Sequence, residues 1–170
     1  MWFIPTQSKS LLAILNSRMG WWLITKFCSQ IQNGCQLIWK YFGQIPIAGS
    51  NANSELETLA DTMLTLHQHL QEERNRFLRR LSNNFEGVKI TTALQQFDTM
   101  DFKGLMAELK KQKIKLSLSQ QDEWEDYFNE RVAECQDLSA QIKATDNEID
   151  NRVFDLYGLT EEERKIVMEE

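Results

Sequence analysis

The chain has 170 residues, of which 42% are hydrophobic and 26% are charged, and its net charge is −6. This composition excludes a disordered chain and indicates one ordinary domain, or a small domain with a helical extension. Seven glycines and two prolines are few, so long helices with few turns are expected.

The charge is unevenly distributed along the sequence. Up to Leu118 there are 14 basic against 9 acidic residues, whereas from Ser119 onward there are 5 against 16. A basic front half can neutralise DNA phosphates even when the whole chain is acidic. The plainer alternative is that these charges only solvate helices.

The cysteines and the apolar stretches bear on the cellular compartment in which the protein is expected. There are three cysteines, their spacing fits no zinc motif, and an odd number argues against a disulfide framework. No signal peptide is visible, and the apolar stretch between Leu11 and Cys28 is interrupted by Arg18 and Lys26. We therefore expect a soluble, cytoplasmic protein without membrane contact.

The first 47 residues hold four of the five tryptophans and predict a helix followed by a strand. Ser8 or Ser10 is expected to cap the helix, which should end near Cys28. Asn33-Gly34 is typical of a turn, and residues 35–41 alternate as a strand with Leu37, Trp39 and Tyr41 on one side. On the helix, the neighbours Trp21 and Trp22 point in different directions, so one is expected in the core and the other at a missing domain or a second copy.

A long helix is predicted from Ser54 to about Asn83, with Ser54 and Glu57 at the spacing of a capping box. Its apolar positions recur at intervals of three and four, with one polar interruption around Glu73 and Arg74. These positions are Leu56, Leu59, Met63, Leu66, Leu70, Phe77 and Leu81.

After a break at residues 84–87, a shorter helix is expected over residues 97–111, followed by a run of lysines. The next helix should run from Gln120 to Tyr157, with Ser119 and Asp122 at its start. At about 1.5 Å per residue it would be about 55 Å long. Its narrow apolar stripe consists of Trp124, Phe128, Cys135, Leu138, Ile142, Thr145, Ile149, Val153 and Leu156.

The end of the chain predicts a helix stop and a new helix start. Tyr157-Gly158 should close the long helix, because glycine can adopt the left-handed conformation that caps a C-terminus. Thr160 and Glu163 have the spacing of a capping box for a last helix.

Together these elements predict a mainly α fold. The two long helices, with such narrow apolar stripes, cannot be stable alone in water. We therefore expect them to pair as an antiparallel, coiled-coil-like helical hairpin bridged by the short helix. A small helix-plus-strand piece should precede this hairpin. The predicted domains are residues 1–50 and residues 51–170.

The sequence lacks the motifs of the obvious catalytic classes. A methyltransferase needs a Gly-rich turn for its cofactor and an Asn/Asp-Pro-Pro-aromatic motif, yet Pro5 and Pro46 lie far apart. A nuclease of the Pro-Asp…Glu-x-Lys type has only half of its motif here. His67 and His69 are two apart on a helix and should be exposed rather than bind zinc. No catalytic residue, cofactor or metal ion is predicted.

A basic cluster offers the candidate binding site. Arginines suit phosphate because the guanidinium donates in a fork, and those of the long helix span about two turns beside Phe77 and Leu81. The alternative is that they pair with the acidic helix alongside, and both uses remain open. The candidate phosphate-binding residues are Arg74, Arg76, Arg79, Arg80, Lys110, Lys111 and Lys113.

Several segments in a fixed order resemble one enzyme family. Residues 144–167 resemble the C-terminal tail of adenine-specific DNA methyltransferases, especially fused type II restriction–modification enzymes with a TaqI-like recognition domain. Residues 3–6, 11–17 and 20–24 resemble the later part of that specificity domain, and residues 33–41 and 43–47 resemble its closing strand. Residues 59–66 and 117–124 are similar to segments that follow.

The resemblance implies a non-catalytic part of a restriction–modification system. In that family this region lies downstream of the methyltransferase domain and takes part in target recognition. The implied partners are DNA, bound weakly and without sequence preference by this chain alone, and a methyltransferase or endonuclease catalytic domain or subunit. A homo-oligomer is possible. The rival hypothesis is a coiled-coil scaffold or dimerisation module without DNA contact.

Overall fold

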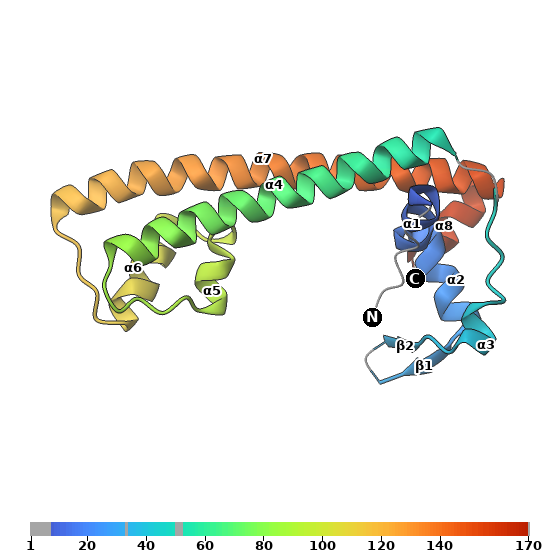
Figure 1. Cartoon of the computed structure of the whole chain (residues 1–170), viewed down its shortest axis with the longest axis horizontal. Helices are drawn as coiled ribbons and strands as arrows, with labels where there is room; N and C mark the ends of the chain where they lie inside the picture. The colour runs from blue at the N-terminus through green and yellow to red at the C-terminus, as the bar shows by residue number, and fades with distance from the viewer. Residues whose placement is uncertain (1–7, 33, 50–52, 170) are drawn as a thin grey trace. The chain divides into compact units, whose positions relative to one another are not determined.

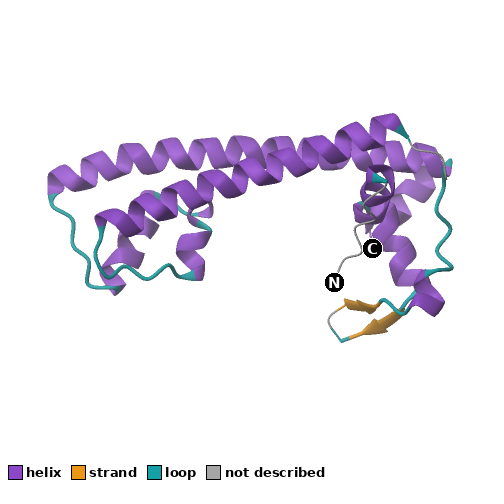
Figure 2. Cartoon of the chain, in the orientation of Figure 1, coloured by secondary structure: helices purple, strands orange, loops and turns teal. Residues whose placement is uncertain are grey.

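The computed structural model describes residues 8–32, 34–49 and 53–169. Within these residues the fold is mainly helical, and Figure 2 shows a single small hairpin of strands beside the helices. The elements are α1 (Lys9–Asn16), α2 (Arg18–Phe27), β1 (Ser29–Ile31), β2 (Gly34–Gln36), α3 (Trp39–Phe42), α4 (Ser54–Asn84), α5 (Thr92–Gln95), the 3-10 turn η1 (Phe97–Thr99), α6 (Phe102–Lys111), α7 (Leu118–Tyr157) and α8 (Glu161–Glu169). No helix within the described ranges is both long and apolar enough to cross a membrane.

Helices α4 and α7 pack against each other as an antiparallel pair (Figure 1). Glu73 of α4 contacts Arg131 of α7, whereas Glu55, nearer the start of α4, contacts Arg152, nearer the end of α7. The predicted mainly α fold with a long helical hairpin is therefore confirmed.

The chain forms two compact units, and each of the two long helices contributes to both. Unit 1 consists of residues 1–64 and 143–170, and unit 2 consists of residues 65–142. This division differs from the predicted boundary at residue 50. The N-terminal elements pack with the first turns of α4 and the last turns of α7, because the apolar faces of α1 and α2 need those stripes to be covered.

The core of unit 1 forms where α1 and α2 meet the ends of the long helices. Its buried members include Ile14, Leu23, Leu56, Val153 and Phe154. Two polar contacts hold the N-terminal segments against α7. The Tyr157 hydroxyl donates to the Pro46 carbonyl at 2.8 Å and accepts from the Ala48 amide at 3.2 Å. The Asp150 carboxylate accepts from the Arg18 amide at 2.8 Å.

The single helix predicted up to Cys28 is instead two helices. Ser8 caps α1 as expected, accepting from the Leu11 amide. The helix then breaks at Ser17, whose hydroxyl donates to the Ile14 carbonyl and accepts from the Gly20 amide. A side chain at Gly20 would meet the Ile14 carbonyl oxygen at 2.2 Å, so only glycine fits this corner.

The strand predicted over residues 35–41 is largely wrong. β2 ends at Gln36 and pairs antiparallel with β1, with Gln30 opposite Cys35, and the predicted Asn33 lies outside the described residues. Trp39 and Tyr41 lie in the short helix α3, and both are exposed. The period-two alternation misled because none of these side chains enters the core, so no buried face selects a strand. The tryptophan pair divides as predicted: Trp22 packs against the core and Trp21 is exposed.

Unit 2 is a helical hairpin closed at one end by the segment between α4 and α7. Phe77 is fully buried and stacks on Phe97 with ring centroids 3.9 Å apart. Phe128 and Trp124 of α7 approach the same phenylalanine edge-on. The helix predicted over residues 97–111 is divided into η1 and α6, and α5 precedes them. In Figure 1, α5 and α6 lie on one side of α4.

The helix ends follow capping rules, with two shifts of position. Asn53, rather than Ser54, accepts from the Leu56 amide at the start of α4. Ser117 and Gln120, rather than Ser119 and Asp122, form the capping box of α7. These shifts lengthen each helix without changing its apolar stripe.

The expected stop and start near the end of the chain are confirmed. Gly158 has φ of +66°, and the Leu159 amide donates to the Phe154 carbonyl, which together make a Schellman motif. The Thr160 amide donates to the Glu163 carboxylate, and the Glu163 amide donates back to the Thr160 hydroxyl.

Candidate nucleic-acid interface

Arg74 is a partly buried arginine of the basic cluster, and its charge is neutralised by an aspartate within unit 2. Its Nε and Nη2 donate to the two carboxylate oxygens of Asp98, at 3.0 and 2.7 Å. The side chain of Asp98 is 5% exposed, and this bidentate contact raises the pKa of Arg74. Because this pairing balances its charge, Arg74 connects η1 to α4 and is poorly suited to hold a phosphate.

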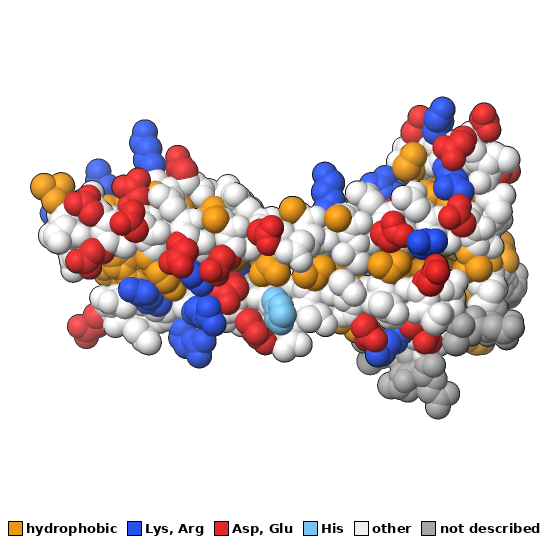
Figure 3. All heavy atoms as spheres, turned by 90° about the horizontal axis from the view of Figure 1, so that it is seen from above, with side chains coloured by type: hydrophobic (Ala, Val, Ile, Leu, Met, Phe, Trp, Pro, Cys, Tyr) orange, Lys and Arg blue, Asp and Glu red, His pale blue; other side chains and the backbone are white. Residues whose placement is uncertain are grey.

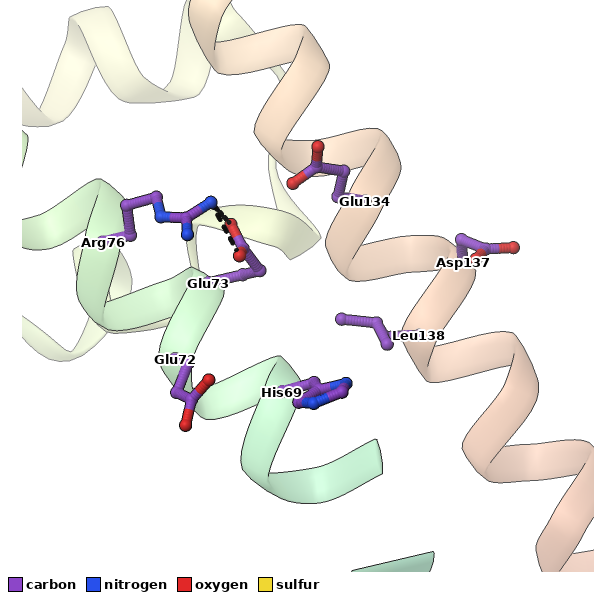
Figure 4. A pocket seen from close by; sticks show the side chains of 7 residues that line it. All are labelled: His69, Glu72, Glu73, Arg76, Glu134, Asp137 and Leu138. Carbon is purple, nitrogen blue, oxygen red and sulfur yellow. Dashed lines mark hydrogen bonds and ion pairs between the residues drawn. The ribbon is translucent and has the colours of Figure 1, made fainter. Parts of the chain in front are cut away.

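Arg76 lies beside an acidic groove between α4 and α7 of unit 2. Its Nη1 pairs with Glu73 of the same helix at 2.9 Å, as the dashed lines in Figure 4 show. The groove has a volume of about 430 Å³. Its lining is mainly carboxylate and consists of His69, Glu72, Glu73, Arg76, Glu134, Asp137 and Leu138. Four carboxylates repel a phosphate, so this face opposes DNA.

Arg80 is held by aromatic rings instead of carboxylates. Its guanidinium lies 3.9 Å from the centroid of the Tyr127 ring and 6.0 Å from that of Trp124, both on α7. Within the described part of the chain it makes no ion pair. A guanidinium that lies over aromatic rings is held without a carboxylate and keeps its N–H donors, so Arg80 remains available to an anion.

The remaining candidate residues differ in whether a carboxylate already pairs with them. Arg79, Lys110 and Lys113 are exposed and make no ion pair with any residue that the structure describes. Lys111 pairs with Glu108 one turn earlier in α6. Lys110 and Lys111 also lie in the last turn of α6, where cations offset the negative end of the helix dipole.

The tip of unit 2 gathers these lysines beside the segment that follows α4. The Lys89 amide donates to the Gln112 side chain, which donates back to the Lys89 carbonyl. Lys113 directly follows Gln112 and has φ of 64°, which turns the chain away from α6. Residues 89 and 110–113 are therefore neighbours in space.

The alternative of pairing with the acidic helix is only partly realised. Among the described residues, none of the four arginines of α4 pairs with a carboxylate of α7, and only Arg80 contacts α7 through ring faces. The left-hand part of Figure 3, which is unit 2, shows apolar side chains between the charged groups of the two helices. In unit 2 the two helices therefore meet mainly through apolar side chains.

The main residue missed in the sequence is Arg131. It is buried on α7 and its guanidinium pairs with Glu73, Glu130 and Glu134 at 2.9, 2.8 and 2.6 Å. Burial lowers the pKa of Arg131 while these carboxylates raise it, with a net upward shift. Its position could have been found from spacing, because residue 131 lies three after Phe128 and four before Cys135 on the predicted stripe.

The two histidines of the chain both lie on α4. His67 and His69 are exposed, as predicted, and His69 lines the acidic groove. Within the described ranges, no group of three or more His, Cys, Asp or Glu side chains is placed to hold a metal ion.

Comparison with known proteins gives a family but no activity. Residues 49–153 match the model of a domain of unknown function, DUF8810. The chain belongs to this family. The match extends from just before α4 to near the end of α7, so the helical hairpin is the family's domain. No curated protein and no solved structure matches the chain significantly.

Proposed function

We propose that this chain is a non-catalytic part of a DNA restriction–modification enzyme of the adenine-specific methyltransferase family, and that unit 2 braces the enzyme against DNA. The proposal starts from the ordered series of segments that resemble that family. Arg80 is the structural observation that supports it best, because its guanidinium lies over a ring and pairs with no carboxylate of the described residues, which leaves its N–H groups for phosphate.

The phosphate contacts would come from a subset of the predicted residues. Arg79, Arg80, Lys110 and Lys113 are exposed and unpaired among the described residues, whereas Arg74 and Arg76 are already neutralised. Such contacts position a protein on DNA without reading bases. Binding by this chain alone would therefore be weak, independent of sequence and sensitive to salt.

The test is titration of a labelled duplex with the full chain at several salt concentrations. Arg80→Gln should reduce the slope of log affinity against log salt by about 0.9, the value of one lost phosphate contact. The matched control is Arg152→Gln, an exposed arginine of unit 1 that pairs with Glu148 and Glu55. Absence of binding at low salt, or equal effects of the two substitutions, would refute the role in DNA contact.

A second candidate function is a protein-docking module without DNA contact. It is favoured by the exposed apolar side chains around α3, of which Trp39 is 78% exposed. Such surfaces commonly mark protein interaction sites. Under this alternative the chain would show no salt-dependent DNA binding. Under either proposal the pure chain should transfer no methyl group from a labelled donor to DNA.

A further inference from the structure

A surface of unit 1 combines exposed apolar side chains with positive charge. The hairpin–α3 surface consists of Ile31, Leu37, Ile38, Trp39 and Tyr41, all exposed. Trp39 is 78% exposed and Ile31 is 57% exposed. A soluble fold that leaves neighbouring large apolar side chains in water usually covers them with another molecule.

The segment that carries this surface contains only basic charged residues. The sequence contains no Asp or Glu before Glu55, whereas Lys26 and Lys40 lie in this region. Lys40 Nζ lies 5.7 Å from the centroid of the Tyr41 ring, and no carboxylate within the described residues pairs with it. A partner that covers this surface must therefore supply apolar contact together with carboxylates.

Helix α8 of the same unit has that complementary chemistry. Glu162, Ile166 and Glu169 recur at intervals of four and three, so they share one face of the helix. Ile166 is 57% exposed, and the two glutamates form no ion pair with described residues. Val167 is buried and holds the opposite side of α8 against the core.

The two surfaces lie on neighbouring elements of one unit. Both α8 and α3 contact α2. A two-fold axis can therefore bring the α8 face of each copy onto the hairpin–α3 surface of the other at the same time, which closes the assembly. An arrangement in which only one such contact forms would leave an apolar surface open.

We propose that the occupant of the hairpin–α3 surface is α8 of a second copy of this chain, in a symmetric dimer. Lys40 meets Glu162 or Glu169, and Trp39 is covered together with Ile166. The dimer is independent of the DNA role, but it presents two copies of unit 2, so DNA affinity rises by avidity if unit 2 binds phosphate.

The dimer is tested by sedimentation and light scattering of the full chain over a range of concentrations. The wild-type chain should dimerise reversibly, and Trp39→Ser should raise the dimer dissociation constant at least about tenfold, because central tryptophans dominate such interfaces. Leu118→Ser is the matched control, since Leu118 is 80% exposed but lies in unit 2, and it should change nothing. Thermal melts check that both variants are folded.

A charge exchange identifies the contact itself. Lys40→Glu alone and Glu162→Lys/Glu169→Lys alone should each weaken the homodimer, because like charges then meet. Mixing the two variants should restore a heterodimer, since both of its contacts carry opposite charges.

Three results would overturn the proposal. The first is a wild-type monomer at every concentration. The second is a dimer that resists Trp39→Ser or responds equally to Leu118→Ser. The third is a monomer whose binding to anionic vesicles or to DNA is lost in Trp39→Ser, which would assign the surface to a membrane or to nucleic acid.

Discussion

Arg131 Nη1 lies 2.9 Å from Glu73 Oε2, across the seam between α7 and α4 in unit 2. Both residues stand where the apolar stripe of their own helix is interrupted: Glu73 between Leu70 and Phe77, and Arg131 between Phe128 and Cys135. The two interruptions are opposite each other, so the ion pair fixes the register of the hairpin. A slide of one helix would bury either charge against carbon.

Glu73→Leu should lower the free energy of unfolding by about 1–2 kcal/mol, because Arg131 keeps Glu130 and Glu134 but loses its partner across the seam. The double variant Glu73→Leu/Arg131→Leu should recover at least that loss, since a packed apolar pair often replaces a buried ion pair without cost. Urea denaturation of both variants measures these energies. A double variant less stable than Glu73→Leu would contradict the assignment.

The Glu73–Arg131 pair marks the limit of what the sequence predicts about the fold. The long helices and their seam were predictable, because the apolar residues of each helix recur at helical spacing. Leu56 and Leu81 of α4 and Val153 of α7 belong to these stripes and are fully buried. The sequence does not predict which polar residues pair across the seam, because the spacing along one helix does not reveal which residue of the other helix lies opposite. Around Trp39 the prediction failed, because exposed side chains carry no burial period to read.

The candidate site was predictable only as a set of charges. Arg74 and Arg80 are equivalent in the sequence, yet the charge of Arg74 is balanced by Asp98, which lies 24 residues away. Arg80 meets Tyr127, which is 47 residues away in the sequence. Contacts made over such separations depend on how the bridging segment folds, and local spacing contains no information about them.

Phe77→Ala should destabilise the protein by about 3–5 kcal/mol, because it opens a cavity where four aromatic rings converge. Leu64→Ala on the same helix is the control, since Leu64 is exposed and its truncation should cost less than about 0.5 kcal/mol. Thermal melts followed by circular dichroism compare the two. Similar melting temperatures for both variants would show that the aromatic cluster does not stabilise the fold.

Asp150 should make stability depend on pH. Burial raises the pKa of this carboxyl above its usual value, despite the opposing contacts from Arg18. The folded state therefore holds this proton more tightly than the unfolded chain, so its contribution is present at low pH and is lost as pH rises through the folded pKa. The window begins near the ordinary aspartate pKa of about 3.9 and extends upward.

Asp150→Asn tests this by removing the titration while keeping the acceptor for the Arg18 amide. The stability difference between variant and wild type, measured by urea denaturation at a series of pH values, should shift in favour of the variant as pH rises through that window. A difference that is independent of pH would refute the prediction.

The three cysteines should differ in reactivity. Burial raises the pKa of Cys135 to about 11, and it also raises the pKa of Cys28, so neither thiol offers much thiolate at neutral pH. Cys35 is only half-buried on β2 and should react first. Alkylation with iodoacetamide, followed by peptide mass spectrometry, orders the three, and guanidinium should make them react alike. Rapid native alkylation of Cys135 would contradict its place in the seam.

The contact between Arg80 and Tyr127 offers the sharpest test of the DNA role, because it separates charge from ordering. Arg80→Gln removes a phosphate contact and should reduce both the affinity for a duplex and the salt slope. Tyr127→Leu keeps every charge but removes the ring on which the guanidinium lies, 3.9 Å away. It should reduce affinity by severalfold, because a mobile arginine loses conformational freedom on binding, and it should leave the salt slope unchanged. Titrations run well below the melting temperature of each variant keep folding out of the comparison. If Tyr127→Leu lowers the slope as much as Arg80→Gln, the ring does more than order the arginine; if it leaves affinity unchanged, the stacked arginine does not contact DNA.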